Sequence, residues 1–348
     1  RLLEKLELTA GMFDKVKNIK SKTFSNFYGY DFNKGGAYDL FINVIAASKK
    51  LKQDLKEASL GDIYKEIKDF DKAKQHYAKA IELGNNSVFT NLADVLKTQG
   101  NFKEAENLLL DAYAKKKIDA IPLLDLYLIS NDPKKGKVSE NVEALLKELG
   151  ENPLRGLYKA LFFLNTGKLT KEKDDKVVLE LEKFVSICTK NQQWDYKFLF
   201  GCSLLLTSYI FGENKKNKAF ELVNVLRAKK IDKELMVSPS VIFVDVWNEN
   251  YSNVIEGISR SIRYFEIDKG DVLNDILMLL IAKKQNHIAL QIFNENPSIV
   301  DLAKPTYYAL MSLLKDQFPN EIIKMGEELK EPVKEILERI AEMAVEYK

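Results

Sequence analysis

Residues 60–80 read LGDIYKEIKDFDKAKQHYAKA, and residues 92–112 read LADVLKTQGNFKEAENLLLDA. The second stretch repeats the first at an offset of 32 residues. Small and apolar residues recur in both at intervals of three, four and seven, which is the spacing of one face of an α-helix. A short polar turn divides each stretch, at 68–69 and at 99–101. The pattern predicts two consecutive pairs of antiparallel helices.

Small residues stand at matching positions of both stretches. Gly61 corresponds to Ala93 in the first predicted helix, and Ala73 corresponds to Ala105 in the second. Residues without a bulky side chain allow two helices to approach closely, while the larger aromatic residues fill the space between neighbouring pairs. We therefore expect Ala73 and Ala105 to be buried at helix–helix contacts.

These positions resemble the tetratricopeptide repeat, whose pattern is Leu-Gly-x-x-Tyr, Ala, an aromatic residue and Ala over 34 residues. Residues 54–85 match it apart from the leading Trp and the closing Pro, where Glu57 and Asn85 stand, and residues 86–118 match well. Fainter echoes of the period follow at 250–258 and 317–325. The resemblance implies an all-α fold, a right-handed α-solenoid of antiparallel helix pairs with a C-terminal capping helix.

Four segments are expected along the chain: N-terminal helices with an aromatic loop (1–53), two clear repeats (54–118), degenerate helix pairs (119–330) and the capping helix (331–348). Two charged segments, 167–176 and 212–218, are expected to be surface loops. Helices are predicted near 2–19, 37–53, 54–67, 70–83, 87–98, 102–115, 120–130, 138–149, 154–165, 174–189, 195–211, 216–229, 239–248, 252–265, 271–284, 286–295, 303–316, 320–329 and 332–346.

The last predicted helix is amphipathic. Its apolar side consists of Val333, Ile336, Leu337, Ile340, Met343 and Ala344. Glu335 and Arg339 are spaced to pair across its polar side. We expect this helix to close the exposed end of the solenoid, or to dock on sequence beyond Lys348.

Composition argues against most enzymes and against a general nucleic-acid binder. The 53 Lys and Arg nearly cancel the 51 Asp and Glu, which leaves a formal charge of +2, whereas nucleic-acid binding needs a surplus or a stripe of positive charge. Two histidines, His76 and His287, and two cysteines leave little material for a metal site. Cys202 lies in an apolar stretch and is interpreted as a core residue, while Cys188 is open to a modestly reactive role.

No nucleotide-binding, hydrolase or metalloprotease motif is present. We therefore expect no catalytic activity, no cofactor and no metal, and an enzyme with an unrecognised site is the third hypothesis. No run of 18 apolar residues occurs, so no transmembrane segment is expected. The chain begins at Arg1, which suggests a fragment, a processed product or the ordered part of something longer. Abundant lysine favours the cytoplasm, although a removed signal peptide is left open.

The resemblance also implies a binding surface. In such stacks the first helices line a groove, and their outward positions contact ligands; here these are Leu55, Ala58, Asp62, Lys65, Ser87, Thr90, Asp94 and Lys97. Of the family's carboxylate-clamp positions, Asn91 alone matches, so binding of a chaperone C-terminus is not expected. The predicted partner-binding residues are Asp62, Lys65, Thr90, Asn91, Asp94 and Lys97.

Two interpretations of the repeated Asp and Lys residues compete. They form either a solvated face stabilised by ion pairs or a polar groove for a peptide. On the second interpretation we expect Asp62, Lys65, Asp94 and Lys97 to be largely exposed and not paired with one another.

An aromatic segment at 24–32 (FSNFYGYDF) lies between two predicted helices. It faintly resembles the aromatic loop of the SNAP family of membrane-fusion adaptors. Alternatively, it packs on the first repeat, or it forms an exposed loop that binds a partner.

The leading hypothesis is a non-enzymatic scaffold or adaptor that binds a partner protein or peptide in the solenoid groove. The alternative is a regulatory or sensor module of a larger protein whose effector domain lies outside these residues. A SNAP-like adaptor is a minor alternative. The partner's identity and the oligomeric state are not predicted.

Overall fold

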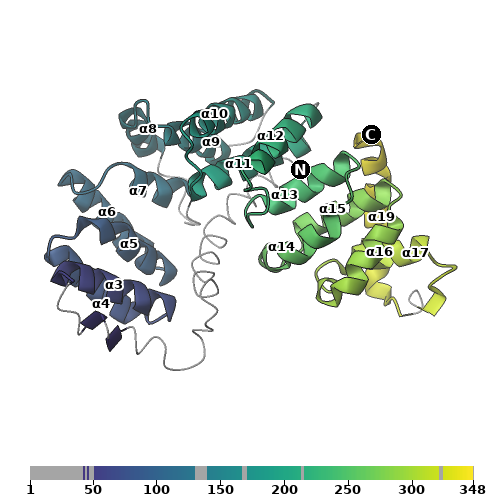
Figure 1. Cartoon of the computed structure of the whole chain (residues 1–348), viewed down its shortest axis with the longest axis horizontal. Helices are drawn as coiled ribbons and strands as arrows, with labels where there is room; N and C mark the ends of the chain where they lie inside the picture. The colour runs from purple at the N-terminus through teal and green to yellow at the C-terminus, as the bar shows by residue number, and fades with distance from the viewer. Residues whose placement is uncertain are drawn as a thin grey trace. The chain divides into compact units, whose positions relative to one another are not determined.

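A computed structural model describes residues 42–43, 45–46, 51–129, 139–166, 171–212, 215–320 and 324–347 (Figure 1). Within these ranges the regular structure is helical and no residue lies in a β-strand, which confirms the all-α helical-repeat fold. The chain divides into two compact units, one within residues 17–168 and the other holding residues 169–348. We call these the N-terminal unit and the C-terminal unit.

The N-terminal unit contains two well-formed helix pairs followed by shorter helices. Its helices are α3 (Gln53–Glu66), α4 (Phe70–Glu82), the 3-10 turn η1 (Asn86–Val88), α5 (Phe89–Thr98), α6 (Phe102–Ala114), α7 (Ile121–Leu124), the π-helical turn η2 (Asp125–Ile129), α8 (Ser139–Glu148) and α9 (Leu154–Asn165). The helices predicted over 54–67, 70–83 and 102–115 are thus present within a residue or two of their expected ends.

The C-terminal unit continues the alternation of helix and short turn. Its elements are α10 (Lys171–Lys190), α11 (Tyr196–Phe211), α12 (Lys216–Ala228), α13 (Ser238–Trp247), α14 (Val254–Asp268), α15 (Asp271–Ala282), α16 (Asn286–Glu295), η4 (Pro297–Ile299), α17 (Lys304–Leu313), η5 (Glu327–Leu329) and α19 (Lys330–Glu346).

Helices of each unit pack in the order expected of a repeat. First helices contact the second helix of their own pair in α3 with α4, α5 with α6, α13 with α14 and α15 with α16. Successive first helices of the C-terminal unit also contact one another, α11 with α13, α13 with α15 and α15 with α17. We call α3, α5, α7–η2 and α9 the first helices of the N-terminal unit, and α11, α13, α15 and α17 those of the C-terminal unit.

The same turn closes the first helices α3 and α5 of the N-terminal unit. After α3, Lys68 adopts a φ of 64°, and the amide of Asp69 donates to the carbonyl of Tyr64 at 2.9 Å. After α5, Gly100 has a φ of 80°, and Asn101 donates to Leu96 at 2.8 Å. Left-handed residues with such hydrogen bonds satisfy the last carbonyl groups of a helix. The Asp69 side chain then accepts from the Lys72 amide at 3.2 Å and caps α4.

Close approach of α3 and α4 depends on the small residues. Ala73 and Ala105 are fully buried, as predicted. A Cβ atom added to Gly61 would lie 2.6 Å from the Tyr77 ring, which is closer than carbon atoms pack. The glycine of the Leu-Gly pair is therefore required by the partner helix rather than by its own backbone.

Replacing Ala73 or Ala105 with leucine is expected to reduce the free energy of unfolding by about 1–3 kcal/mol, because the added atoms have no room. Urea unfolding followed by far-ultraviolet circular dichroism would measure the change. Ala114, which lies beyond the packed part of α6 and is exposed, provides the control substitution Ala114→Leu. Equal stability of all three variants would contradict the packing register.

The two charged segments expected as loops overlap the predicted helices that begin at 174 and 216, and the structure adds 171–173 to the first of these helices. α10 begins at Lys171 and α12 at Lys216, so 171–176 and 216–218 are helical. Asp174 and Lys215 form an ion pair at 3.3 Å, and both side chains are mostly buried. Burial raises the pKa of Asp174 more than Lys215 lowers it. Because Asp174 and Lys215 are paired and mostly buried, the described parts of these two segments are not the hydrated loops that were expected.

Three expectations for the C-terminal end are wrong. Residues 324–326 are not helical and are followed by the 3-10 turn η5, so a helix does not span 320–329. Arg339 pairs with Glu342 and Glu346, at 2.7 Å each, rather than with Glu335. The apolar side includes buried Val333, Ile340 and Met343, whereas Ala344 is exposed. The position of α19 is described below.

Several expectations lie outside the described residues. The aromatic segment at 24–32 and the helix at 2–19 belong to this group. One continuous superhelix across residues 168–169 and the domain boundaries expected at 53, 118 and 330 stay predictions.

Candidate partner-binding site

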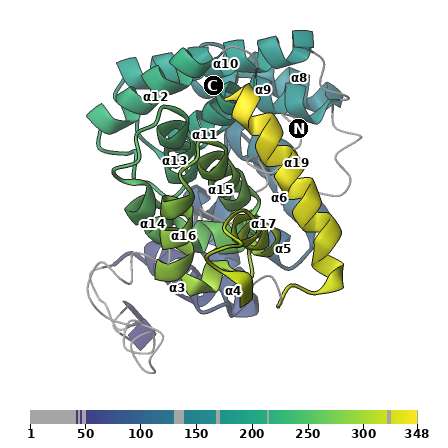
Figure 2. The same ribbon diagram turned by 90° about the vertical axis from the view of Figure 1, so that its right-hand side faces the viewer.

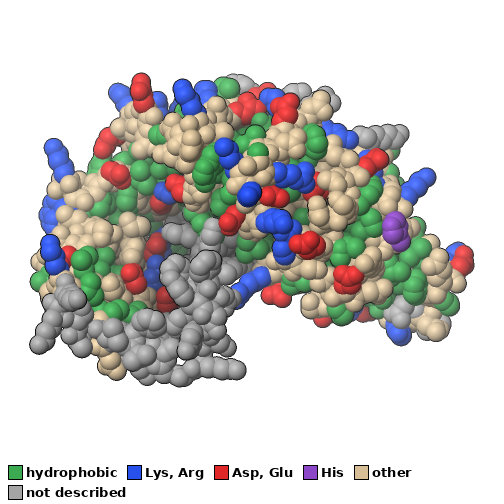
Figure 3. All heavy atoms as spheres, in the orientation of Figure 1, with side chains coloured by type: hydrophobic (Ala, Val, Ile, Leu, Met, Phe, Trp, Pro, Cys, Tyr) green, Lys and Arg blue, Asp and Glu red, His purple; other side chains and the backbone are tan. Residues whose placement is uncertain are grey.

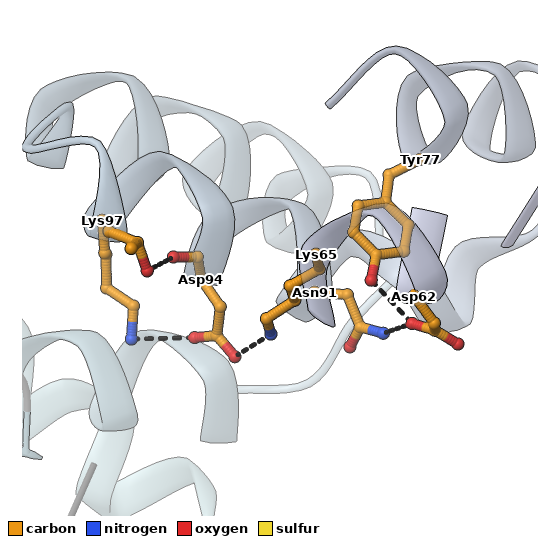
Figure 4. Close-up of polar contacts among 7 residues, drawn as sticks. Asp62, Lys65, Tyr77, Asn91, Asp94 and Lys97 are labelled. Atoms are coloured by element: carbon orange, nitrogen blue, oxygen red, sulfur yellow. Dashed lines mark hydrogen bonds and ion pairs between the residues drawn. The ribbon is translucent and has the colours of Figure 1, made fainter. Parts of the chain in front are cut away.

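The six predicted partner-binding residues lie on two neighbouring first helices. α3 carries Asp62 and Lys65, and α5 carries Thr90, Asn91, Asp94 and Lys97. Five of the six interact across or along these helices, as Figure 4 shows. Thr90 is half-buried and lies one turn before Asp94 on α5.

Asp62 is an acceptor shared by two helices. Its Oδ1 atom accepts a hydrogen bond from the Tyr77 hydroxyl at 2.6 Å and another from Asn91 Nδ2 at 3.0 Å (Figure 4). Burial, and then the Asp62 carboxylate, raise the pKa of Tyr77 well above its ordinary value, so the hydroxyl keeps its proton. Asp62 therefore links α3 to α4 within one repeat and to α5 of the next.

Asp94 is the centre of a second cluster. Lys65 Nζ lies 3.5 Å from its Oδ2 atom, and Lys97 Nζ lies 2.9 Å from its Oδ1 atom. The side chains of Lys65, Asp94 and Lys97 are 27%, 20% and 15% exposed. For these three residues the expectation that they would be largely exposed and unpaired is wrong, because α3 and α5 approach within reach of a lysine side chain, whereas Asp62 is exposed, as expected. We call Asp62, Lys65, Asn91, Asp94 and Lys97 the polar ladder.

The remaining outward positions divide between solvent and core. Leu55 and Ser87 are exposed, in agreement with the register implied by the resemblance. Ala58, by contrast, is buried, so it does not belong to the binding face. The face is therefore more polar than the eight positions suggested.

Asp125 occupies the ladder position of the third repeat and was missed. It stands in Leu123-Leu124-Asp125, as Asp62 stands in Leu60-Gly61-Asp62. Its Oδ1 atom accepts from the Tyr158 hydroxyl at 2.6 Å, much as Asp62 accepts from Tyr77. An offset of 31 residues from Asp94, rather than 32, was the available signal.

Glu57 replaces the leading Trp of the family pattern and is buried. Its carboxylate receives Lys79 Nζ at 2.9 Å, Gln53 Nε2 at 2.8 Å and His76 Nδ1 at 2.8 Å. The His76 ring also stacks on Tyr64, with ring centroids 5.1 Å apart. Burial raises the pKa of Glu57, but the hydrogen bonds from Lys79, His76 and Gln53 outweigh it and leave the pKa below its ordinary value. A charged cluster thus holds α3 to α4 where the family pattern has a Trp.

Because folding lowers the pKa of Glu57, its charged form stabilises the folded state above its ordinary pKa of about 4.3. That contribution is lost as the pH falls through the lowered pKa. The difference in unfolding free energy between the parent and Glu57→Gln should therefore be constant near neutral pH and shrink below about pH 4. The substitution Lys79→Met should reduce this difference in unfolding free energy between the chain with Glu57 and its Glu57→Gln variant. Urea titrations at several pH values would measure it, and a difference that grows on acidification would contradict the role of Glu57.

The thiols of the described residues, Cys188 and Cys202, are buried. Burial raises the pKa of Cys188 to about 11 and that of Cys202 well above its ordinary value. Over the ranges that the structure describes, no three His, Cys, Asp or Glu side chains are grouped to hold a metal ion. In Figure 3, cations and anions are interspersed on the visible face.

None of the helices described is long and apolar enough to span a membrane. No curated protein matches the chain. The family model of the tetratricopeptide repeat matches residues 58–86, which include most of α3 and all of α4. The pairing of α3 with α4 through Gly61, Ala73 and Tyr77 agrees with that match. Residues 58–86 therefore match a tetratricopeptide repeat, and this repeat suggests a protein–protein interaction module.

Proposed function

We propose that the chain is a non-enzymatic scaffold or adaptor that binds a partner protein or peptide across the first helices of its N-terminal unit. The observation that carries the proposal is the polar ladder. Its five side chains are reached by solvent, yet they are held in place by contacts between repeats. Ordered polar groups lose little conformational entropy on binding, which favours recognition of a polypeptide.

The ladder offers donors and acceptors beyond those it uses internally. Lys65 Nζ carries three N–H groups and meets Asp94 only at the long distance of 3.5 Å. Asn91 donates to Asp62 through Nδ2, so its carbonyl oxygen remains an acceptor. A polypeptide backbone presents matching N–H and C=O groups, and both charges of the face allow side chains of either sign to be bound.

Site-specific photo-cross-linking of the full chain tests the location of the surface. A photoreactive phenylalanine derivative would replace Thr90, between the two clusters, and separately Gln75, which is exposed on the second helix α4. A cell extract is irradiated, and the cross-linked products are identified by mass spectrometry. We expect a polypeptide to be cross-linked at position 90, and we expect that this polypeptide is not cross-linked at position 75. The reverse result would place the binding surface on the second helices and contradict the proposal.

A further inference from the structure

The helix α19 lies along the first helices of its own unit instead of closing the end of the stack. It packs against α17 and α15, and its C-terminal cap residue, Tyr347, reaches α13 and α11 (Figure 2). Four successive first helices are therefore in contact with this one element. The tetratricopeptide resemblance predicts that ligands bind on the first-helix side, and here the chain itself occupies that side.

Tyr347 is the anchor of this arrangement. Its side chain is almost fully buried, and its ring packs edge-on against Phe243 and Trp247, with centroids 5.4 and 5.1 Å away. Its hydroxyl donates to the carbonyl of Ile210, at the end of α11, at 3.3 Å. An aromatic ring held in an apolar site, with a satisfied hydroxyl, is the form that the strongest contacts of protein interfaces take.

Two of the first helices under α19 are buried on every side, and their buried residues are apolar apart from Asp245 and Asp275. Residues 241–247 of α13 and residues 275–281 of α15 are buried without a break. Seven consecutive positions make almost two helical turns, so both the side facing the second helices and the opposite side must be covered. In the N-terminal unit, by contrast, α5 leaves Asn91, Asp94 and Lys97 within reach of solvent. The C-terminal unit thus has a first-helix side that requires an apolar occupant.

The apolar side of α19 is the part of the chain that covers this surface. Val333, Ile340 and Met343 face inward with Tyr347, at positions that share one side of a helix. On its outer side Arg339 pairs with Glu342 and Glu346, which belong to α19 itself. The helix is therefore stabilised partly by its own residues, and it is seated by apolar contacts together with the Tyr347 hydroxyl.

We propose that the first-helix side of the C-terminal unit is a binding site for an amphipathic helix ending in an aromatic residue, and that α19 blocks it. An external helix with the spacing of Val333, Ile340, Met343 and Tyr347 binds only when α19 leaves. This site is separate in residues and in chemistry from the polar ladder, so either can fail without the other. It follows the mode in which the apolar face of a helix lies in an apolar groove.

A labelled peptide of residues 330–348 tests the proposal on the full chain. Fluorescence anisotropy would measure its binding to the parent chain, to the double variant Met343→Ala/Tyr347→Ala, and to Val345→Ala, a matched truncation on the exposed side of α19, where Val345 is 68% exposed. We expect the double variant to bind the peptide at least tenfold more tightly than the parent and Val345→Ala do. A peptide carrying Tyr347→Ala should bind none of them. Equal binding to all three chains would overturn the proposal.

Hydrogen exchange of the unaltered chain gives an independent result that does not depend on the folding of a variant. If α19 leaves its site while the unit stays folded, the amides of 333–346 should exchange at least tenfold faster than the buried amides of α13 and α15. Exchange of α19 at the same rate as those helices would show that it opens only with the whole unit, and it would overturn the proposal.

Discussion

Replacing Gly201 with valine is expected to destabilise the C-terminal unit by about 3 kcal/mol or more. Gly201 lies inside α11 and faces the ring of Phe184 on α10. Both residues are buried, and even a Cβ atom at 201 would overlap that ring. Because valine adds three carbon atoms where no space exists, α10 and α11 must separate. The midpoint of thermal unfolding should fall by roughly 6–12 °C for a unit of this size.

Tryptophan fluorescence measures this change directly, since the two tryptophans, Trp194 and Trp247, both lie in the C-terminal unit. The double variant Gly201→Val/Phe184→Leu should recover part of the loss, because the smaller side chain makes room. Phe184→Leu alone is the control for the cavity that the smaller residue creates. Additive effects of the two substitutions, or an unchanged midpoint for Gly201→Val, would contradict this packing.

The second large effect is expected at Arg227, at the end of α12. Its guanidinium donates to both oxygens of Asp245 on α13, at 2.5 and 2.6 Å, and Asn250 adds a weaker bond at 3.3 Å. The Asp245 side chain is only 8% exposed. Arg227→Met would leave a buried carboxylate without its cation, which is expected to cost about 3 kcal/mol at neutral pH.

Acidification should relieve that cost. Burial raises the pKa of Asp245 above its ordinary value, although Arg227 and Asn250 lower it in part. Without Arg227 the pKa rises further, so the folded variant takes up a proton more readily than the unfolded chain and gains stability as the pH falls. The difference in unfolding free energy between the parent and Arg227→Met should therefore decrease from pH 7 to pH 4.5. Arg227→Met/Asp245→Asn should restore much of the stability, and a difference independent of pH would contradict the explanation.

Local repeats allowed most helices to be predicted, because their spacing depends on residues close in sequence. The start of α10 was predicted three residues late, at 174 instead of Lys171, for the opposite reason, whereas the start of α12 at Lys216 was predicted correctly. The pair formed by Asp174 and Lys215 joins two charged segments 41 residues apart, and it becomes visible only once α10 and α12 are packed. Charge alone could not distinguish that buried pair from a hydrated loop.

Within the candidate site, the positions of the ladder residues followed from the repeat, but their partners did not. Lys65 and Asp94 lie on different helices, and their pairing depends on the distance between stacked repeats. Asp125 was missed because the second repeat is a residue shorter than the first, which places Asp125 31 residues after Asp94 instead of 32.

The position of α19 could not be predicted from its amphipathic pattern. That pattern indicates that one side must be covered, without indicating by what. A complementary signal lay in the continuous apolar stretches of α13 and α15, at 241–244 and 276–282. A first helix that is buried on all sides requires a second covering layer, and α19 is the element that provides it.

The central claim, binding at the polar ladder, is tested most directly by titration of the polypeptide cross-linked at position 90 against three forms of the full chain. The first is the parent. The second is Lys65→Ala/Lys97→Ala, which removes both lysine partners of Asp94. The third is Lys74→Ala/Lys103→Ala, on the second helices. It removes the pair of Lys74 with Glu104, which joins two repeats, and the pair of Lys103 with Glu106, which lies within α6.

Isothermal titration calorimetry should show a loss of about 2–5 kcal/mol of affinity, or roughly 30- to 4,000-fold, for Lys65→Ala/Lys97→Ala. The second-helix variant should stay within about threefold of the parent, because exposed pairs contribute about 0–1 kcal/mol. Circular dichroism would establish that both variants remain folded. Equal affinities for the two double variants would contradict binding at the ladder and leave it a solvated face stabilised by ion pairs.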